Sequence, residues 1–346
     1  MIKVAINGFG RIGRLALRKI MNEQDMEVVA INDLGDTKML AHLLKFDSAQ
    51  GVFSKSVNFD EDSITVNNKK IKVYKESDPE KLPWKELDVD IVLECTGLFK
   101  KKEQAMKHIN AGAKKVIISA PSDGDVKTIV YNVNHTELTK DDIIISAASC
   151  TTNALAPAAK ILNDQFLINV GYMSTIHAYT NDQNLLDLPH KNGDLRRARS
   201  AANNIVPSST GAAKAIGKVI KELDGKLDGS SVRVPVMSGS LIELTCELEE
   251  SATVDEINRL FYEKKNETIG YTDIEIVSSD IIGSEFGGIF DSTLTKVVDT
   301  PDGKLVKISI WYDNEMGYTS QMIRTCKYLG ELLWKEKEKN ILQDYI

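Results

Sequence analysis

The sequence predicts an α/β protein in which a doubly wound parallel sheet is followed by a second, α+β domain with a mixed or antiparallel sheet. In the first half, short apolar runs typical of buried strands alternate with helical patterns. In the second half, strand-like runs follow one another with few helical patterns between them. A length of 346 residues is enough for about two cores. We therefore expect a first domain over residues 1–149, completed by a C-terminal helix over 316–346, and a second domain over 150–315.

The first half follows a regular alternation of strands and helices. Strand candidates lie at 3–7, 27–31, 89–94, 115–119 and 142–146, and helical periodicity lies at 14–22 and 101–111. Asn67-Asn68 separates two β-type runs, 64–66 and 71–74, which favours a tight antiparallel hairpin. This order predicts parallel strands with helices packed on both faces of the sheet.

The second half contains mainly strand candidates, at 170–178, 231–236, 242–247, 293–298 and 306–312. A long polar segment from 181 to 207 interrupts them and carries a basic cluster of Arg196, Arg197 and Arg199. Ordered loops of this length are usually functional or lie at an interface. From Met322 the apolar residues recur with helical spacing, which predicts the final helix.

Composition excludes several classes of protein. A net charge of −7 disfavours general nucleic-acid binding, and no apolar run reaches the length of about 18 residues that a membrane span needs. The N-terminus begins as a strand without the features of a signal peptide, so we expect a cytoplasmic protein. The 4 cysteines are far apart and form no Cys-x-x-Cys pair, which predicts free thiols and no metal site.

A glycine-rich motif, Gly8-Phe9-Gly10-Arg11-Ile12-Gly13, follows the first strand and opens the first helix. In that context the glycines permit a tight turn, a close backbone approach and tight helix packing, and a pyrophosphate binds at the helix N-terminus. Asp33 ends the second strand about twenty residues further on, where a carboxylate accepts ribose hydroxyls and repels an additional phosphate. These residues predict a Rossmann-type dinucleotide site that prefers NAD to NADP.

The best candidate for chemistry is Cys150, within Ser149-Cys150-Thr151-Thr152-Asn153 at the expected start of a helix. Free N–H groups and the helix dipole at such a position stabilise a thiolate and can hold an oxyanion. Of the 5 histidines, His177 stands where a strand meets a loop, which suits a general base for the thiol. Spacing alone leaves this pairing open, and a Cys-His hydrolase without a cofactor is a second interpretation.

The chain resembles the glyceraldehyde-3-phosphate dehydrogenase family over nearly its whole length. The resemblance rests on segments 6–14 and 148–153, and on His177-Ala178-Tyr179-Thr180-Asn181-Asp182-Gln183, together with 194–199, 207–215, 233–235 and 311–315. It implies an NAD-dependent enzyme of glycolysis that oxidises glyceraldehyde 3-phosphate and phosphorylates the product. The nearest alternative is a paralogue that acts on erythrose 4-phosphate.

The resemblance also implies a role for individual residues. Cys150 forms a thiohemiacetal and then a thioester, and His177 activates the thiol. The implied contacts of the substrate phosphate are Thr180, Asp182 and Arg233, and those of the incoming phosphate are Ser149, Thr151, Arg197, Thr210 and Gly211. The implied NAD contacts are Gly8, Gly10, Arg11, Ile12, Gly13, Asp33, Ser119 and Asn314.

The family's assembly gives one further expectation, a homotetramer in which segment 181–203 packs against the cofactor site of a neighbouring subunit. Several positions depart from the common family pattern, among them the segment Val236-Met237-Ser238-Gly239-Ser240, which stands where Thr-Pro-Asn-Val-Ser is familiar. The sequence alone assigns no consequence to this departure.

Overall fold

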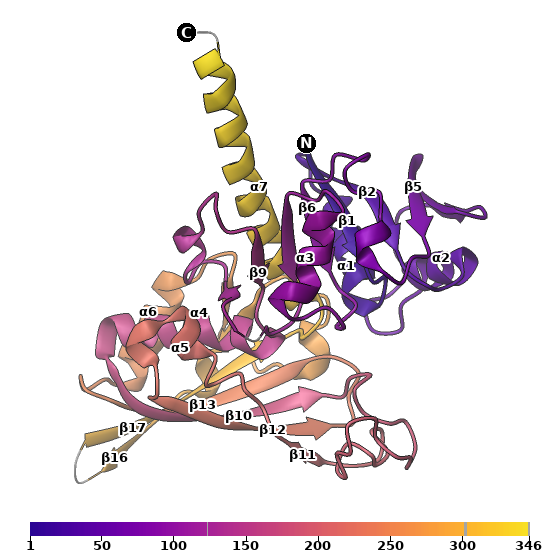
Figure 1. The fold of residues 1–346 in the computed structure, drawn as a ribbon. Helices are drawn as coiled ribbons and strands as arrows, with labels where there is room; N and C mark the ends of the chain where they lie inside the picture. The colour runs from indigo at the N-terminus through magenta and orange to yellow at the C-terminus, as the bar shows by residue number, and fades with distance from the viewer. Residues whose placement is uncertain (123, 301–302, 345–346) are drawn as a thin grey trace. The chain divides into compact units, whose positions relative to one another are not determined.

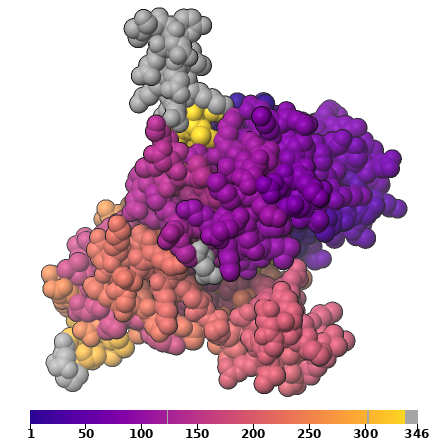
Figure 2. All heavy atoms as spheres, viewed as in Figure 1, coloured from indigo at the N-terminus to yellow at the C-terminus, as the bar shows by residue number. Residues whose placement is uncertain are grey.

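The computed structural model describes residues 1–122, 124–300 and 303–344. The chain forms two compact units, unit 1 over Met1–Ala148 and Met322–Ile346 and unit 2 over Ser149–Gln321. In Figures 1 and 2 unit 1 is mostly indigo to purple and unit 2 is mostly pink to orange. The last two residues of the expected C-terminal helix lie outside the described part of the chain.

In the described residues, unit 1 contains a nine-stranded sheet with the order β3-β4-β5-β2-β1-β6-β7-β9-β8. All neighbours from β5 to β8 are parallel, whereas β3 and β4 are antiparallel additions at one edge. The strands are β1 Ile2–Asn7, β2 Met26–Asn32, β3 Val57–Phe59, β4 Ser63–Val66, β5 Lys69–Tyr74, β6 Ile91–Glu94, β7 Lys115–Ile118, β8 Lys127–Thr128 and β9 Ile144–Ser146. The helices are α1 Arg11–Ile20, α2 Thr37–Lys45 and α3 Lys102–Asn110, with short 3-10 turns at Pro79–Lys81 and His135–Glu137.

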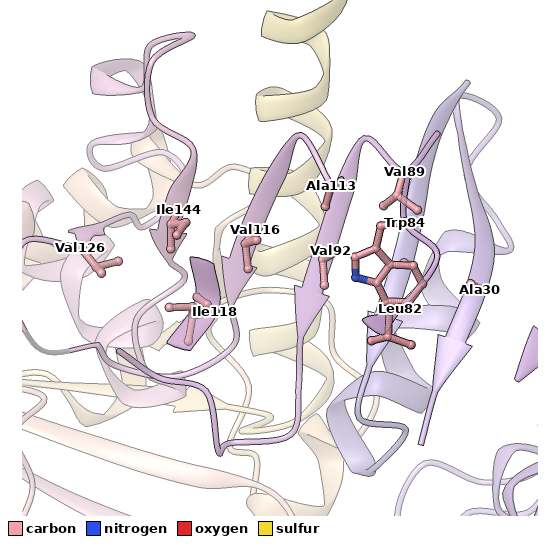
Figure 3. Packing of buried hydrophobic residues seen from close by; sticks show 12 residues of the cluster. Ala30, Leu82, Trp84, Val89, Val92, Ala113, Val116, Ile118, Val126 and Ile144 are labelled. Atoms are coloured by element: carbon pink, nitrogen blue, oxygen red, sulfur yellow. The ribbon is translucent and has the colours of Figure 1, made fainter. Parts of the chain in front are cut away.

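A core of small and branched side chains packs against this sheet. Trp84 is completely buried and lies beside Leu82 and Val92 in Figure 3, while Val116 and Ile118 continue the same layer along β7. Truncation of a buried tryptophan to alanine typically costs about 3–5 kcal/mol of stability. The central parallel strands β6, β7 and β9 are buried at every residue, which is why their sequences are mostly apolar.

The predicted parallel sheet of unit 1 is confirmed, and so is the hairpin. Asn67 and Asn68 have positive φ angles of 45° and 68°, as a tight two-residue hairpin turn requires, and they join the antiparallel strands β4 and β5. Helix α2 was not predicted from the sequence, although Asp36 caps it by accepting from the N–H groups of Lys38 and Met39.

In its described part, unit 2 contains an eight-stranded mixed sheet with the order β11-β12-β10-β13-β17-β15-β14, to which β16 is added through β17. The strands are β10 Ile168–Ala178, β11 Val206–Ser208, β12 Leu227–Val234, β13 Ser240–Leu248, β14 Ile269–Thr272, β15 Gly288–Asp291, β16 Lys296–Thr300 and β17 Gly303–Tyr312. The helices are α4 Cys150–Phe166, α5 Ile216–Val219 and α6 Val254–Lys264, which lie on one face of the sheet in Figure 1. The final helix, α7 Met316–Asp344, begins in unit 2 and continues in unit 1.

The predicted mixed sheet is confirmed, with two local errors. The strand expected at 293–298 begins only at Lys296, because Asp291 accepts from the N–H of Thr293 and turns the preceding residues into a 3-10 helix. Helix α6 was missed, although Thr253 and Glu256 form a capping box at its start. None of the helices in the described part has both the length and the apolar character needed to cross a membrane.

Candidate active site

The three glycines of the glycine-rich turn meet three different requirements. Gly8 has φ +90°, and an added Cβ would lie 2.6 Å from the backbone nitrogen of Thr96. A Cβ on Gly13 would lie 2.2 Å from the carbonyl oxygen of Gly8. A Cβ on Gly10, in contrast, would have no atom within 4 Å. The fold itself therefore requires glycine at the first and third positions, while the second leaves open space at the start of α1.

The start of α1 is prepared for an anion. Gly10 is the N-cap and supplies no side-chain cap, and the first turn contains no acidic residue. The first N–H groups of a helix lack internal acceptors, so they attract a phosphate. The guanidinium of Arg11 binds both carboxylate oxygens of Asp47 at 2.9 Å, so its side chain is joined to the segment that follows α2.

Asp33 is joined to the glycine-rich turn directly. Its carboxylate accepts from the N–H of Phe9 at 2.7 Å and from the N–H of Gly35 at 2.8 Å. Each oxygen keeps a further lone pair, which is what two ribose hydroxyls need. Ser119 follows β7 and donates its N–H to the carbonyl of Glu94 at 2.9 Å. These residues all follow parallel strands of unit 1, at the edge where doubly wound sheets bind their ligands.

A buried polar network below the turn was missed by sequence analysis. Trp84 donates from Nε1 to Nδ1 of His108 at 3.0 Å, and Nε2 of His108 lies 3.0 Å from Glu94. Because an indole N–H can only donate, the proton of the neutral imidazole is on Nε2 and points to the carboxylate. Glu94 accepts in addition from Asn7 and from the N–H of Thr96. The network fixes the backbone that touches Gly8, and polar residues at the ends of apolar strands were its only sign in the sequence.

The candidate nucleophile, Cys150, is the first residue of α4, as expected. Ser149 caps the helix by accepting from the N–H of Thr152 at 3.0 Å, and Ala148 has φ 59° in the turn before it. Cys150 itself is half-buried. The hydroxyl oxygen of Thr151 lies 4.0 Å from Sγ of Cys150. The helix start thus presents the sulfur together with the free N–H groups of the first turn.

His177 is the histidine that meets this sulfur, since its Nε2 lies 3.4 Å from Sγ of Cys150. The opposite ring nitrogen, Nδ1, lies 2.7 Å from the carbonyl oxygen of Ala178. A carbonyl can only accept, so Nδ1 carries the proton and Nε2 is left unprotonated. The lone pair of the imidazole therefore faces the thiol, which is the arrangement of a general base and its nucleophile.

Burial and the charge of Arg233 shift the pKa values of both Cys150 and His177. Burial raises the pKa of the Cys150 thiol, although the positive charge of Arg233 and a hydrogen bond from Thr151 act in the opposite direction. Burial, reinforced by Arg233, lowers the pKa of His177 to about 3. The stabilisation of the thiolate expected from the helix start is outweighed by desolvation.

Arg233 brings a fixed positive charge to the pair. It lies opposite His177 in the parallel pairing of β10 with β12, and its Nη1 donates to the carbonyl of Ala178 at 3.1 Å and to the hydroxyl of Thr180 at 3.2 Å. Its Nε is buried and has no hydrogen-bond partner among the residues that the structure describes. A guanidinium with an unused donor beside a threonine hydroxyl is suited to a phosphate.

The remaining residues expected to bind phosphate contact one another or their own loops. Asp182 pairs with Arg197, so its carboxylate orients a guanidinium and is itself no phosphate donor. Thr210 and Gly211 follow β11, where the hydroxyl of Thr210 accepts from the N–H of Ala212 at 3.1 Å. Within the described ranges, neither Thr210 nor Gly211 forms a hydrogen bond with Cys150 or His177.

Two residues near the pair were not expected from the sequence. The hydroxyl of Tyr312 lies 3.1 Å from that of Thr151 and 2.7 Å from that of Thr175, and its ring meets the ring of His177 edge-on at 5.8 Å. Ser240 contacts Asn314, the residue expected to hold the nicotinamide amide, at 2.9 Å. Both come from distant strands, so local sequence patterns contain no signal for them.

Comparisons with known proteins give a consistent result. Residues 2–102 match the family model of the glyceraldehyde 3-phosphate dehydrogenase NAD binding domain, and residues 149–314 match that of the glyceraldehyde 3-phosphate dehydrogenase C-terminal domain. Curated proteins named glyceraldehyde-3-phosphate dehydrogenase from Clostridium pasteurianum and Clostridium acetobutylicum are 60% and 58% identical over 332 residues, which is 96% of this chain and 99% of each relative. One from Streptococcus pyogenes is 56% identical over 333 residues, again 96% of this chain and 99% of the relative.

Proposed function

The chain belongs to the glyceraldehyde-3-phosphate dehydrogenase family, and we propose that it oxidises D-glyceraldehyde 3-phosphate to 1,3-bisphosphoglycerate with NAD and inorganic phosphate. The observation that carries this proposal is the 3.4 Å contact between Sγ of Cys150 and the unprotonated Nε2 of His177. The alternative, a paralogue acting on erythrose 4-phosphate, is not favoured, because the relatives at 56–60% identity all carry the name of the glyceraldehyde enzyme.

NAD fits the residues of the first domain, which we propose as residues 1–149 completed by 316–346. Open space in front of Gly10 and the uncapped start of α1 support a pyrophosphate bound by the backbone of Gly10, Arg11 and Ile12. The free lone pairs of Asp33 support binding of the ribose and exclude a second phosphate. Ser119 and Asn314 complete the proposed contacts. When bound, NAD supplies the hydride acceptor.

The chain's own groups account for the steps around the carbonyl carbon. The sulfur of Cys150 attacks the aldehyde, the carbonyl π bond breaks, and the thiol proton passes to Nε2 of His177. The N–H groups at the start of α4 stabilise the negative oxygen of this addition. After oxidation, a phosphate oxygen attacks the thioester carbon and the carbon–sulfur bond breaks. The acyl group is thereby transferred to phosphate, and the sulfur of Cys150 is the leaving group. His177 returns a proton to the sulfur.

We propose two anion positions around this pair, in the domain over residues 150–315. The substrate's own phosphate is bound by Thr180 and Arg233, with Asp182 holding Arg197 in place. The incoming phosphate is bound by hydroxyls and amides of Ser149, Thr151, Thr210 and Gly211, with the guanidinium of Arg197. The unused Nε donor of Arg233 supports the first position.

The assembly and location are part of the same proposal. We propose a cytoplasmic homotetramer in which segment 181–203 contacts a neighbouring subunit. In the space-filling view this segment belongs to the pink lobe at the lower right (Figure 2). Leu185, Leu186, Leu188 and Leu195 on it are 62–85% exposed, and exposed apolar side chains gathered on one surface are typical of an interaction site. Sedimentation at micromolar concentration distinguishes a tetramer from a monomer.

The test of the activity is NADH formation from glyceraldehyde 3-phosphate and NAD, followed by absorbance with and without inorganic phosphate. We expect sustained turnover only with phosphate, because the thioester on Cys150 otherwise stays on the enzyme. The same assay with erythrose 4-phosphate measures the alternative. A higher kcat/KM on the erythrose substrate, or turnover independent of phosphate, would contradict the proposal.

A further inference from the structure

The hydroxyl of Ser240 connects the segment of the catalytic histidine with Asn314. Its Oγ accepts from the N–H of Ala178 at 3.1 Å and donates to Oδ1 of Asn314 at 2.9 Å. The carbonyl of the same Ala178 accepts from Nδ1 of His177 at 2.7 Å. Hydrogen bonds to the two peptide groups that flank the Cα of Ala178 therefore connect His177 and Ser240 to this one residue, and Ser240 connects it to Asn314, entirely within unit 2.

The sheet explains why Ser240 occupies this position. It is the first residue of β13, opposite Tyr312 of β17, while the next residue, Leu241, lies opposite Ile176 of β10. Strand β10 contains His177 near its end, and Asn314 follows the end of β17. One residue at the start of the strand between them can reach both, and Ser240 is only 1% exposed, so water does not compete for its hydroxyl.

The neighbours of Ser240 keep it in place. Gly239 has φ +88°, and a Cβ there would lie 2.1 Å from the carbonyl oxygen of Ser278, so no other residue fits without a shift. Ser238 donates to Asp313 at 2.8 Å, and Asp313 also accepts from the N–H of Gly283 at 2.8 Å. Segment 236–240 thus holds Asp313 through Ser238, which departs from the common family pattern, and Asn314 through Ser240, which matches it.

The chemistry of the hydroxyl fixes the orientation of the amide. A serine has one proton and, here, a backbone N–H already points at its oxygen, so its proton needs an acceptor. The acceptor is the carbonyl oxygen Oδ1 of Asn314, since an amide NH₂ has no lone pair to offer. Nδ2 of Asn314 therefore points away from Ser240 as a donor. A donor at this place recognises a carbonyl oxygen, such as that of a nicotinamide carboxamide.

We propose that Ser240 is a positioning residue that sets the orientation of the Asn314 amide for the carboxamide oxygen of NAD. This inference rests on the proposed function, because Asn314 has to contact the cofactor. Without the hydroxyl the amide is free to rotate, and binding of NAD then includes the cost of ordering it. The loss of one such hydrogen bond corresponds to a dissociation constant higher by about five- to tenfold.

The test is a double-mutant cycle on NAD binding, measured by calorimetry on the full-length chain in the absence of substrate. Ser240→Ala should raise the dissociation constant of NAD by about five- to tenfold in the wild-type background. In an Asn314→Ala background the same substitution should have no further effect, because Ser240 acts only through that amide. Ser240→Cys, which keeps most of the volume with a weak donor, should behave like Ser240→Ala and replaces it if the alanine variant does not fold.

The matched control is Ser309→Ala. Ser309 is fully buried on β17 in the same unit, and its hydroxyl has no hydrogen-bond partner among the described residues, so its removal should leave NAD affinity unchanged. Equal weakening by Ser240→Ala in both backgrounds would identify a merely structural role and overturn the inference, as would unchanged affinity in the wild-type background. If the wild-type chain itself does not bind NAD, the proposed function fails, and the inference with it.

Discussion

Replacement of His177 by asparagine should remove a specific loss of stability at acid pH. His177 is 4% exposed, and burial together with the charge of Arg233 lowers its pKa from 6.5 to about 3. The unfolded chain therefore binds more protons than the folded chain between these two values. The free energy of unfolding must then decrease as the pH falls below about 6.5, because protonation favours the unfolded state.

The size of the effect follows from the same two values. For one group with a pKa of 6.5 unfolded and about 3 folded, lowering the pH from 7 to 5 costs about 2 kcal/mol of the free energy of unfolding. This is a substantial part of the total stability of a typical protein, which is about 5–15 kcal/mol. The His177→Asn variant has no such group, so its stability should decrease by about 2 kcal/mol less over this pH interval.

The assay is urea unfolding of the wild-type and variant proteins at pH 7 and pH 5, at one protein concentration. Only the difference between the two pH values is compared, because the substitution also changes packing at both. The control is His42→Asn, which removes an exposed histidine of α2 and should leave the wild-type pH dependence intact. If wild type and His177→Asn lose the same free energy between pH 7 and pH 5, the buried, neutral state of His177 is refuted.

Three further predictions concern the cofactor turn, the thiol and the buried network. Gly10→Ala should fold normally but bind NAD weakly by calorimetry. Gly13→Ala should lower Tm as well, because its Cβ would lie 2.2 Å from the carbonyl oxygen of Gly8. Equal Tm values for the two variants would contradict this prediction. Cys150→Ser should abolish phosphate-dependent NADH formation with an NAD dissociation constant within about twofold of wild type, since the sulfur is needed for acyl transfer and not for binding; residual turnover would point to another nucleophile. Trp84→Phe should cost about 1–3 kcal/mol in urea unfolding, because Nδ1 of His108 loses its buried donor, and a smaller loss would show that water replaces the indole.

Features encoded in neighbouring residues could be predicted from the sequence. The glycine-rich turn, the Asn67-Asn68 hairpin and the position of Cys150 at the start of a helix depend on backbone angles and free N–H groups within a few residues. The helices that were not predicted also have local signals in their sequences, which were not recognised. Helix α6, for example, has a capping box in its sequence, and its apolar positions follow helical spacing.

Features that depend on strand pairing could not be predicted. No local sequence pattern indicates that β10 lies between β12 and β13. This arrangement brings Arg233 beside His177 and Ser240 beside Ala178. Tyr312 reaches Thr151 from a position 161 residues away. Contacts of this kind follow from the register of whole strands, which is set by burial of their apolar faces.

The sequence by itself determined the fold class, the glycine-rich turn expected to bind the nucleotide, and the choice of Cys150 as the candidate nucleophile, because each is encoded locally or in a motif. Only the tertiary structure decided that Nε2 of His177 meets the sulfur of Cys150, and that burial raises the pKa of the thiol and lowers that of the imidazole. The physical reason is that protonation depends on desolvation and on the charge of Arg233, and both exist only after the strands have assembled around the pair.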